Sequence, residues 1–292
     1  MKHPLRMRVA IVGHGAIGRV MERALADRAE LVFIDRTRSP LREGEAPVDA
    51  AVVCVKTPGT AWAGEVSSRL LATDGVALTI QNGLGNYEQL VDAVGAARVA
   101  VGVIYVGAGF RADGSHYATG AGRIELAPPR GAAPAKSLAT LVELFRAGGV
   151  QVDVRDDPWP AVWRKLSANA VMNAPSAIFD ATYSEIAGDA ARALLCDALA
   201  RESAAIVTAA GYPTSANDAV AAWRAIATAM PEHRSSMHAD VERGRETEVD
   251  AINGALVREA ERRGVPAPLN LAMTALVPPM SASREPAAAA RR

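Results

Sequence analysis

Arg8-Val-Ala-Ile-Val12 leads directly into Gly13-His-Gly-Ala-Ile-Gly18, near the start of a chain of 292 residues. The first five residues form a short apolar run, which is typical of a strand buried on both faces of a parallel sheet. The glycine-rich turn that follows has the pattern G-x-G-x-x-G, and residues 16–28 after it have the composition of a helix. Strand, glycine turn and helix in this order predict the first unit of a doubly wound α/β sheet.

Each glycine of this turn has its own expected role. The first permits a tight turn, the second lets the backbone approach a pyrophosphate, and the third lets helix and strand pack closely. The helix that follows presents free N–H groups and the positive end of its dipole to a phosphate. An ordinary tight turn is the alternative, and His14 is expected to face solvent or phosphate rather than to catalyse. The residues expected to bind a dinucleotide here are Gly13, His14, Gly15, Ala16, Ile17 and Gly18.

Further along, strand and helix patterns alternate until about residue 155. Strands are predicted over 31–34, 50–55, 76–80 and 99–106, a helix over 60–73, and an antiparallel pair over 110–126. After Asp156-Asp157-Pro158 the strand patterns end, and alanine, leucine and long charged side chains dominate. We therefore predict a Rossmann domain over 1–155, an all-helical domain over 156–280, and a flexible tail over 281–292, with the active site between the two domains.

Composition limits the partners that we expect. Lys plus Arg and Asp plus Glu number 32 each, so no net field favours nucleic acid or an anionic membrane, and any anion must be bound locally. No apolar run approaches the roughly 18 residues of a membrane helix, and the short apolar run after the first residues is not a signal peptide. Cys54 and Cys196 fit no metal or redox spacing. We expect a soluble, cytoplasmic protein with no metal.

The end of the second predicted strand bears on the choice of dinucleotide, and its signals are mixed. Asp35 stands where a carboxylate accepts hydrogen bonds from the adenosine ribose of NAD. Arg36 and Arg38 follow, and a guanidinium suits the 2′-phosphate of NADP. We favour NADPH and leave NADH open. Three solvated loop charges are the alternative.

A polar stripe crosses an otherwise apolar helix predicted after residue 158. Lys165, Asn169 and Asn173 are spaced four residues apart, so all three project from one side of the helix. A lysine ammonium can donate a proton to a ketone oxygen as a hydride arrives, while neutral asparagines hold the substrate. An internal hydrogen-bond network or a solvated face is the alternative. The apolar residues around the stripe, which we expect to be buried, are Val162, Trp163, Leu166, Val171 and Met172.

Two more segments carry candidate residues. Asn82 follows a predicted strand, at the rim where open α/β sheets bind ligands, and can reach a nicotinamide ribose or a substrate carbonyl. Ser236 fits an N-cap of a long helix that ends near Gly264, so its hydroxyl and the next amides could bind a carboxylate. Glu248, about three turns along that helix, could bind a cofactor ribose or orient Lys165. A plain Asn-Gly turn, an ordinary cap and a surface glutamate are the alternatives.

Taken together, these motifs resemble those of the ketopantoate reductases (2-dehydropantoate 2-reductases), within the larger 6-phosphogluconate dehydrogenase-like group. The resemblance covers nearly the whole chain and is more specific than the glycine turn alone. Its parts are Gly13-His-Gly-Ala-Ile-Gly18, Val55-Lys56, Gln81-Asn82-Gly83-Leu84-Gly85-Asn86, Trp163-Arg164-Lys165-Leu166 with Asn169 and Asn173, Arg234-Ser235-Ser236-Met237, and Thr247-Glu248 with Ile252-Asn253-Gly254.

The resemblance implies NADPH-dependent reduction of 2-dehydropantoate to (R)-pantoate, a precursor of pantothenate and coenzyme A. It implies that Lys165 is the proton donor and that Asn169, Asn173 and Ser236 hold the substrate. Asn82 would touch both ligands. The residues implied to contact the cofactor are Arg36, Lys56, Ala108 and Glu248.

The chain also departs from the family pattern. The stretch between Arg36 and Lys56 is shorter than usual, and Asp35 precedes Arg36 where an apolar residue is usual. His233 replaces a common asparagine of the substrate loop, and Tyr183 stands where an asparagine contacts substrate. A sibling dehydrogenase of another 2-keto or 2-hydroxy acid is therefore the second hypothesis, and a non-catalytic dinucleotide sensor is the third. A homodimer is left open.

Overall fold

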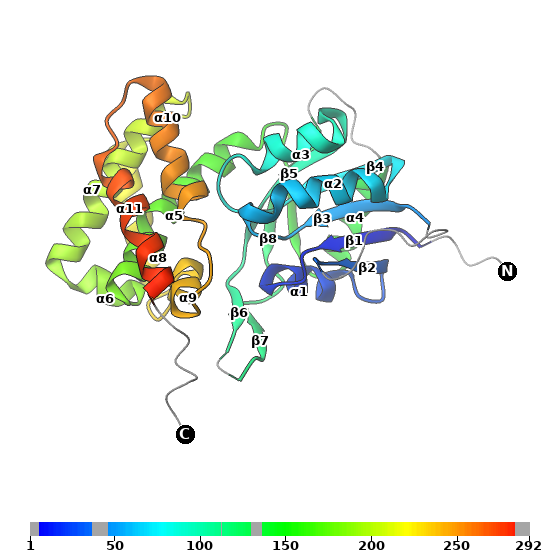
Figure 1. Ribbon diagram of the computed structural model, residues 1–292, viewed down its shortest axis with the longest axis horizontal. Coiled ribbons are helices and arrows are strands. Elements are labelled where there is room, and N and C mark those ends of the chain that lie inside the picture. The colour runs from blue at the N-terminus through cyan, green and yellow to red at the C-terminus, as the bar shows by residue number, and fades with distance from the viewer. Residues whose placement is uncertain (1–5, 37–45, 112, 130–135, 284–292) are drawn as a thin grey trace. The chain divides into compact units, whose positions relative to one another are not determined.

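The computed structural model describes residues 6–36, 46–111, 113–129 and 136–283 of the chain. The chain forms two compact units, Met1–Ala161 and Val162–Arg292 (Figure 1). None of the helices formed by the described residues combines the length and the apolar character that a membrane span requires. Arg38, one of the two arginines expected to meet a 2′-phosphate, lies outside the described residues.

The first unit is built on a mixed sheet whose larger part is parallel. Strands β2, β1, β3, β4 and β5 pair in parallel, β8 runs antiparallel to β5, and β9 runs parallel to β8. The chain passes from β1 to β2 on one side and then to β3 on the other side of β1, so the strand order reverses at β1. In sheet order the strands of the described residues are β2 (Glu30–Ile34), β1 (Arg8–Val12), β3 (Val48–Val53), β4 (Leu71–Thr79), β5 (Val99–Tyr105), β8 (Arg123–Ala127) and β9 (Gln151–Val154).

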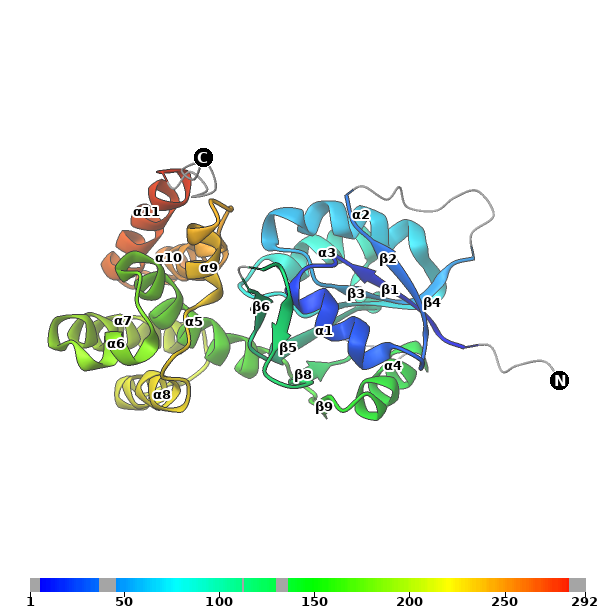
Figure 2. The same ribbon diagram turned by 90° about the horizontal axis from the view of Figure 1, so that it is seen from below.

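Helices cover both faces of this sheet because its strands are apolar on both sides. Successive residues of a strand point to opposite faces. Val9 and Ile11 of β1 therefore join a core with α1 and α4, while Ala10 and Val12 join a second core with α2 and α3 (Figure 2). This arrangement confirms the predicted Rossmann class. The helices are α1 (Ala16–Leu25), η1 (Thr57–Gly59), α2 (Thr60–Leu70), α3 (Asn86–Val94), η2 (Ala96–Arg98) and α4 (Lys136–Ala147).

The antiparallel pair predicted over 110–126 is shorter than expected. Strands β6 (Ala108–Phe110) and β7 (His116–Ala118) form a separate two-stranded hairpin, with its turn at Asp113-Gly114. Gly120 and Gly122 follow with φ of 102° and 88°, and such left-handed conformations end a strand. The chain then enters β8, whose buried residues extend the main sheet beside β5.

The second unit is helical throughout its described residues, as predicted. Its long helix α5 (Trp159–Phe179) is buried along most of its length, and Pro160 lies in the first turn as expected. The other helices are α6 (Tyr183–Gly188), α7 (Ala190–Ala209), α8 (Ala216–Ala229), α9 (Ser236–Glu242), the π-helical turn η3 (Asp250–Gly254), α10 (Ala255–Arg263) and α11 (Pro268–Ser283).

The long helix predicted to start at Ser236 and end near Gly264 is wrong in its middle. Helix α9 stops at Glu242, and Gly244 adopts a left-handed φ of 60°. The chain becomes helical again only near η3, and Gly264 then caps α10 with a φ of 68°. Glu248 therefore lies in the connection before η3, not three turns along the helix that begins at Ser236.

The N-cap of α9 is Ser235, not Ser236 as predicted. The Ser235 hydroxyl accepts from the backbone N–H of His238 and donates to the backbone carbonyl of Asn173, each over 3.0 Å. The backbone N–H of Ser235 donates to the hydroxyl of Ser176 over 3.2 Å. Ser235 is buried and makes all three of these bonds, whereas Ser236 is the exposed first residue of α9. The cap thereby ties α9 to the carbonyl of Asn173 on α5.

We expect Ser235→Ala to lower the free energy of unfolding by about 1–2 kcal/mol, because it removes a helix cap. Ser236→Ala is the matched control, since it removes a neighbouring hydroxyl that does not cap α9, and it should change stability by less than about 0.5 kcal/mol. Urea denaturation followed by circular dichroism measures both. Equal losses for the two variants would contradict the assignment of the cap.

Candidate active site

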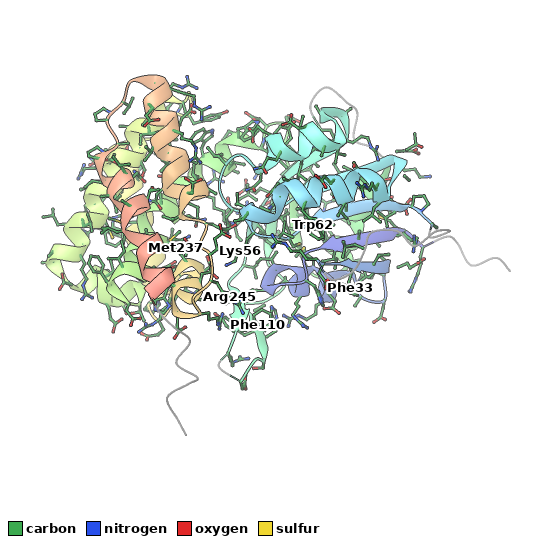
Figure 3. The ribbon with its side chains drawn as sticks, viewed as in Figure 1. Phe33, Lys56, Trp62, Phe110, Met237 and Arg245 are labelled. Carbon is green, nitrogen blue, oxygen red and sulfur yellow. The ribbon has the colours of Figure 1, made fainter. Side chains whose placement is uncertain are left out.

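Five predicted ligand-contacting segments lie at one edge of the sheet. Because β2, β1, β3, β4 and β5 are parallel, their carboxyl ends all meet at this edge, which we call the rim. The Lys56 side chain lies at the end of the sheet where α2 begins (Figure 3). In strand order the residues at the rim are Asp35 and Arg36 after β2, Gly13 after β1, Lys56 after β3, Asn82 after β4, and Ala108 after β5.

The glycine turn at the rim has the geometry expected of its three glycines. Gly13 has a φ of 96°, its N–H donates to Ile34 O over 2.8 Å, and an added Cβ would lie 2.7 Å from the backbone nitrogen of Val55. A Cβ on Gly18 would lie 2.2 Å from Gly13 O, so α1 packs directly on the turn. A Cβ on Gly15 would meet nothing within 4 Å. The open side of the turn is therefore at Gly15, where α1 begins.

His14 is held by protein groups rather than only by solvent. Its Nε2 lies 2.7 Å from a carboxylate oxygen of Glu22, and its ring centroid lies 4.6 Å from that of Phe33. Glu22 belongs to α1 and Phe33 to β2. The His14 side chain thus joins the first helix to the second strand, while its backbone remains part of the turn. Asp35 and Arg36, just beyond Phe33, are both exposed.

In the second unit, the polar stripe lies on α5 as the spacing predicts. Lys165 and Asn169 are partly buried, and Asn173 is 5% exposed. Among the residues that the structure describes, no group makes a hydrogen bond to the side-chain amide of Asn169 or of Asn173, so both amides remain available to a ligand. Of the apolar residues expected to be buried around the stripe, four are buried and Val162 is partly buried; the four are Trp163, Leu166, Val171 and Met172.

Lys165 and Glu248 form the charged part of this region. Burial lowers the pKa of the Lys165 ammonium to about 8, and the negative charge of Glu248 opposes that shift. The two groups are therefore close enough to interact, although they are far apart in the sequence. At pH 7 the ammonium form still predominates, and its proton is more easily given up than that of an exposed lysine.

Two backbone carbonyls of α5 between Asn169 and Asn173 are held by side chains that belong to none of the predicted motifs of the polar stripe. Pro175 has no N–H to donate to Val171 O four residues earlier, and the Cys196 thiol takes up that carbonyl at 3.7 Å. The side-chain amide of Asn253 donates to Ala170 O over 3.1 Å. These contacts, together with that of Ser235, fix the backbone that carries Asn169 and Asn173.

Two family models match most of the chain. The model described as ketopantoate reductase PanE/ApbA matches residues 39–131, and the model of its C-terminal part matches residues 157–281. The 2-dehydropantoate 2-reductase of Halobacterium salinarum is 31% identical over 80% of this chain and 76% of its own length. That of Pyrobaculum aerophilum is 32% identical over 83% of this chain and 81% of its own length.

Solved structures have the same fold. A PanE/ApbA family ketopantoate reductase from Ralstonia eutropha superposes with a TM-score of 0.80 at 27% identity, covering 94% of this chain and 98% of its own. A complex of D-mandelate dehydrogenase with NADH superposes with a TM-score of 0.84 at 21% identity, covering 96% of this chain and all of its own, and shows the fold alone. The chain belongs to the ketopantoate reductase family of oxidoreductases.

Proposed function

We propose that this protein reduces a small 2-keto acid with NADPH, and that 2-dehydropantoate, reduced to (R)-pantoate, is its first candidate substrate. The observation that carries the proposal is Lys165: its pKa is lowered to about 8, and it lies on the same helix face as two asparagine amides. The relatives from Halobacterium and Pyrobaculum named above are 2-dehydropantoate 2-reductases.

The rim of the first unit fits a dinucleotide. An added Cβ at Gly15 would meet nothing within 4 Å, no side chain of the described residues caps α1, and no acidic residue lies in its first turn, so the start of α1 suits a phosphate. The dinucleotide would supply the hydride. In our proposal Arg36 meets the 2′-phosphate. The other residues assigned to the cofactor are Gly13, His14, Gly15, Ala16, Ile17, Gly18, Lys56, Asn82, Ala108 and Glu248.

The second unit carries the groups that act on the substrate. The Lys165 ammonium donates a hydrogen bond to the keto oxygen and gives it a proton as negative charge develops there. Glu248 keeps Lys165 charged and oriented, and contacts the cofactor ribose. The amides of Asn169 and Asn173, with the exposed hydroxyl of Ser236, hold the substrate. The bond from Ser235 to Asn173 O supports this grouping, since it holds the start of α9 beside α5.

A dinucleotide-binding sensor remains the least favoured alternative. A sensor needs only the first unit. Burying the Lys165 ammonium on α5 is unfavourable for folding, and such buried charges with shifted pKa values are more typical of catalytic sites than of binding modules. A cytoplasmic location is a further part of the proposal, and the homodimer is left open.

One observation favours a second candidate, a sibling dehydrogenase that acts on a keto acid with an aromatic or otherwise apolar side chain. Tyr183 and His233, which replace asparagines expected at the edge of the substrate site, contact each other with ring centroids 5.1 Å apart. Tyr183 is buried, and burial lowers the pKa of His233, which favours its neutral form. An edge built of two neutral rings is less polar than one built of asparagines. D-mandelate dehydrogenase, which shares the fold, is a protein of this kind.

The first prediction from the proposal concerns the proton donor. Lys165→Ala should lower kcat by about 10²–10⁴, the usual worth of general-acid help, while the Kd for NADPH stays near normal. In the unsubstituted protein kcat should hold below about pH 8 and fall above it, because the acid form of Lys165 is lost there. Lys136→Ala, at an exposed lysine of α4, is the matched control. A Lys165→Ala variant that keeps most of its kcat would remove Lys165 from the mechanism.

The second concerns the cofactor. If Arg36 binds the 2′-phosphate through a charge-assisted bond worth roughly 1.5–3 kcal/mol, Arg36→Ala should lower kcat/KM for NADPH about tenfold or more and leave that for NADH nearly unchanged. Steady-state kinetics with both cofactors measures this, and Arg69→Ala, at an exposed arginine of α2, is the control. Equal kcat/KM values for the two cofactors in the unsubstituted protein would mean that Asp35, which suits the adenosine ribose of NAD, and not Arg36 dominates the choice of cofactor.

The third concerns the substrate. A panel of 2-keto acids, including 2-dehydropantoate and phenylglyoxylate, is to be assayed beside their methyl esters by NADPH oxidation. We expect the acids to be far better than the esters, and Ser236→Ala to raise KM by a factor equivalent to about 1–3 kcal/mol with little change in kcat. Comparable kcat/KM for acid and ester would refute a carboxylate site. A clear preference for phenylglyoxylate would replace the first candidate by the second.

A further inference from the structure

We infer that Thr60, Gln81 and Asn86 are positioning residues, which fix the backbone of Lys56 and Asn82 at the rim through one chain of hydrogen bonds. The inference rests on the proposed function, because it is that function that gives Lys56 and Asn82 their cofactor contacts. It goes beyond it by assigning a role to three side chains that touch neither ligand in that proposal.

The need for such residues follows from where the strands end. The ladder of β3 ends at Val53 and that of β4 at Thr79, so Lys56 and Asn82 both lie beyond the last paired residues. Sheet hydrogen bonds therefore do not set their positions. The two segments belong to neighbouring strands, and a dinucleotide that meets both requires a fixed spacing between them.

Gln81 joins the two segments. Its side-chain N–H₂ donates to the carbonyl of Val55, next to Lys56, over 2.9 Å, and to the hydroxyl of Thr60 over 2.8 Å. Its side-chain oxygen accepts from the hydroxyl of Thr79 over 3.0 Å. All of the amide's hydrogens are thus in use, and the end of β4 is linked to the end of β3.

Thr60 and Asn86 extend this series of hydrogen bonds to Asn82. Thr60 has one hydroxyl hydrogen, and it donates this hydrogen to the side-chain oxygen of Asn86 over 2.7 Å while accepting from Gln81. The Asn86 amide then donates to the backbone carbonyl of Asn82 over 2.8 Å. Each hydrogen donated in this series of bonds has one acceptor, so the direction of each bond is determined by its neighbours.

Most of these hydrogen-bonded side chains are buried, which restricts them to the partners that the structure gives them. Thr60 is 0%, Asn86 3% and Thr79 4% exposed, so water has little access to replace a partner that these three lose, while Gln81 is partly exposed. If the Thr60 hydroxyl is removed, one N–H of Gln81 and the side-chain oxygen of Asn86 are both left without a partner. Asn86 then loses one of its two side-chain hydrogen bonds, which weakens the positioning of the amide that donates to the carbonyl of Asn82.

The same helix offers a control. Ser67 of α2 is also fully buried, and its hydroxyl has no hydrogen-bond partner among the described residues. It lies seven positions after Thr60, on the same side of the helix. Ser67→Ala therefore removes a buried hydroxyl from the same packing environment without touching the chain that leads to Asn82.

The experiment compares Thr60→Val, Thr60→Ser and Ser67→Ala in the full chain. NADPH fluorescence titration gives both the Kd and the number of binding sites, which separates a weakened site from a smaller folded fraction. We expect about a tenfold higher Kd for Thr60→Val, the lower part of the range for an unpaired buried group. Thr60→Ser should restore the Kd to within about twofold, because it returns the hydroxyl. Ser67→Ala should bind as the unsubstituted protein does.

A Thr60→Val variant with fewer sites but an unchanged Kd would overturn the inference, because a merely structural role lowers only the folded fraction. If Thr60→Val does not fold, Asn86→Ala decides alone: a Kd raised about tenfold supports the chain to Asn82, and an unchanged Kd overturns it. An unsubstituted protein that binds neither NADPH nor NADH would instead reject the proposed function. The two failures are therefore distinguishable.

Discussion

Parallel pairing is the constraint on which the first unit depends. Five neighbouring strands run in one direction, so all their carboxyl ends meet at one rim, and each contributes one loop to it. The reversal of strand order at β1 separates the loops after β1 and β3 and lets the turn at Gly13 open outward. Gly13 can make that turn only because it has no side chain, since a Cβ there would collide with the backbone of Val55.

The second unit depends on a different compromise, made on α5. Because α5 is apolar on nearly every side, it packs firmly and keeps its polar side chains in fixed positions. The same packing partly removes Lys165 from water, which is unfavourable for its ammonium form. Opposite charge at Glu248 offsets part of that cost, and the lowered pKa of Lys165 is what remains. The Cys196 thiol contacts the Val171 carbonyl, which Pro175 cannot serve, and Asn253 and Ser235 donate to two further carbonyls of α5. The burial of α5 therefore both holds its polar side chains in place and lowers the pKa of Lys165.

Local patterns predicted much of this structure. Strand β1, the glycine turn and α1 were readable because each depends on adjacent residues, and the stripe on α5 was readable because its spacing equals the helical repeat. Asp35, Arg36 and Asn82 followed from strand ends, whereas the assignments of Lys56 and Ala108 came from the family resemblance. The wrong assignment of the cap depends on a distant contact: Ser235 lies where its hydroxyl reaches the carbonyl of Asn173, 62 residues away, and the sequence offers two adjacent serines without indicating which one reaches it. Thr60 and Asn86, 26 residues apart, belong to no shared motif.

The hydrogen bonds among the side chains of Gln81, Thr60, Thr79 and Asn86 have one more consequence. Amide and aliphatic hydroxyl groups neither gain nor lose a proton over the pH range in which proteins are folded. A link made of carboxylates or histidines would gain or lose protons as the pH changed. These four side chains keep the same hydrogens on the same atoms, so the link that they form between the Lys56 and Asn82 segments does not depend on the acidity of the solution. In the proposed mechanism the proton comes from Lys165, which belongs to the other unit, so the group that titrates and the hydrogen bonds that position the cofactor loops are separate.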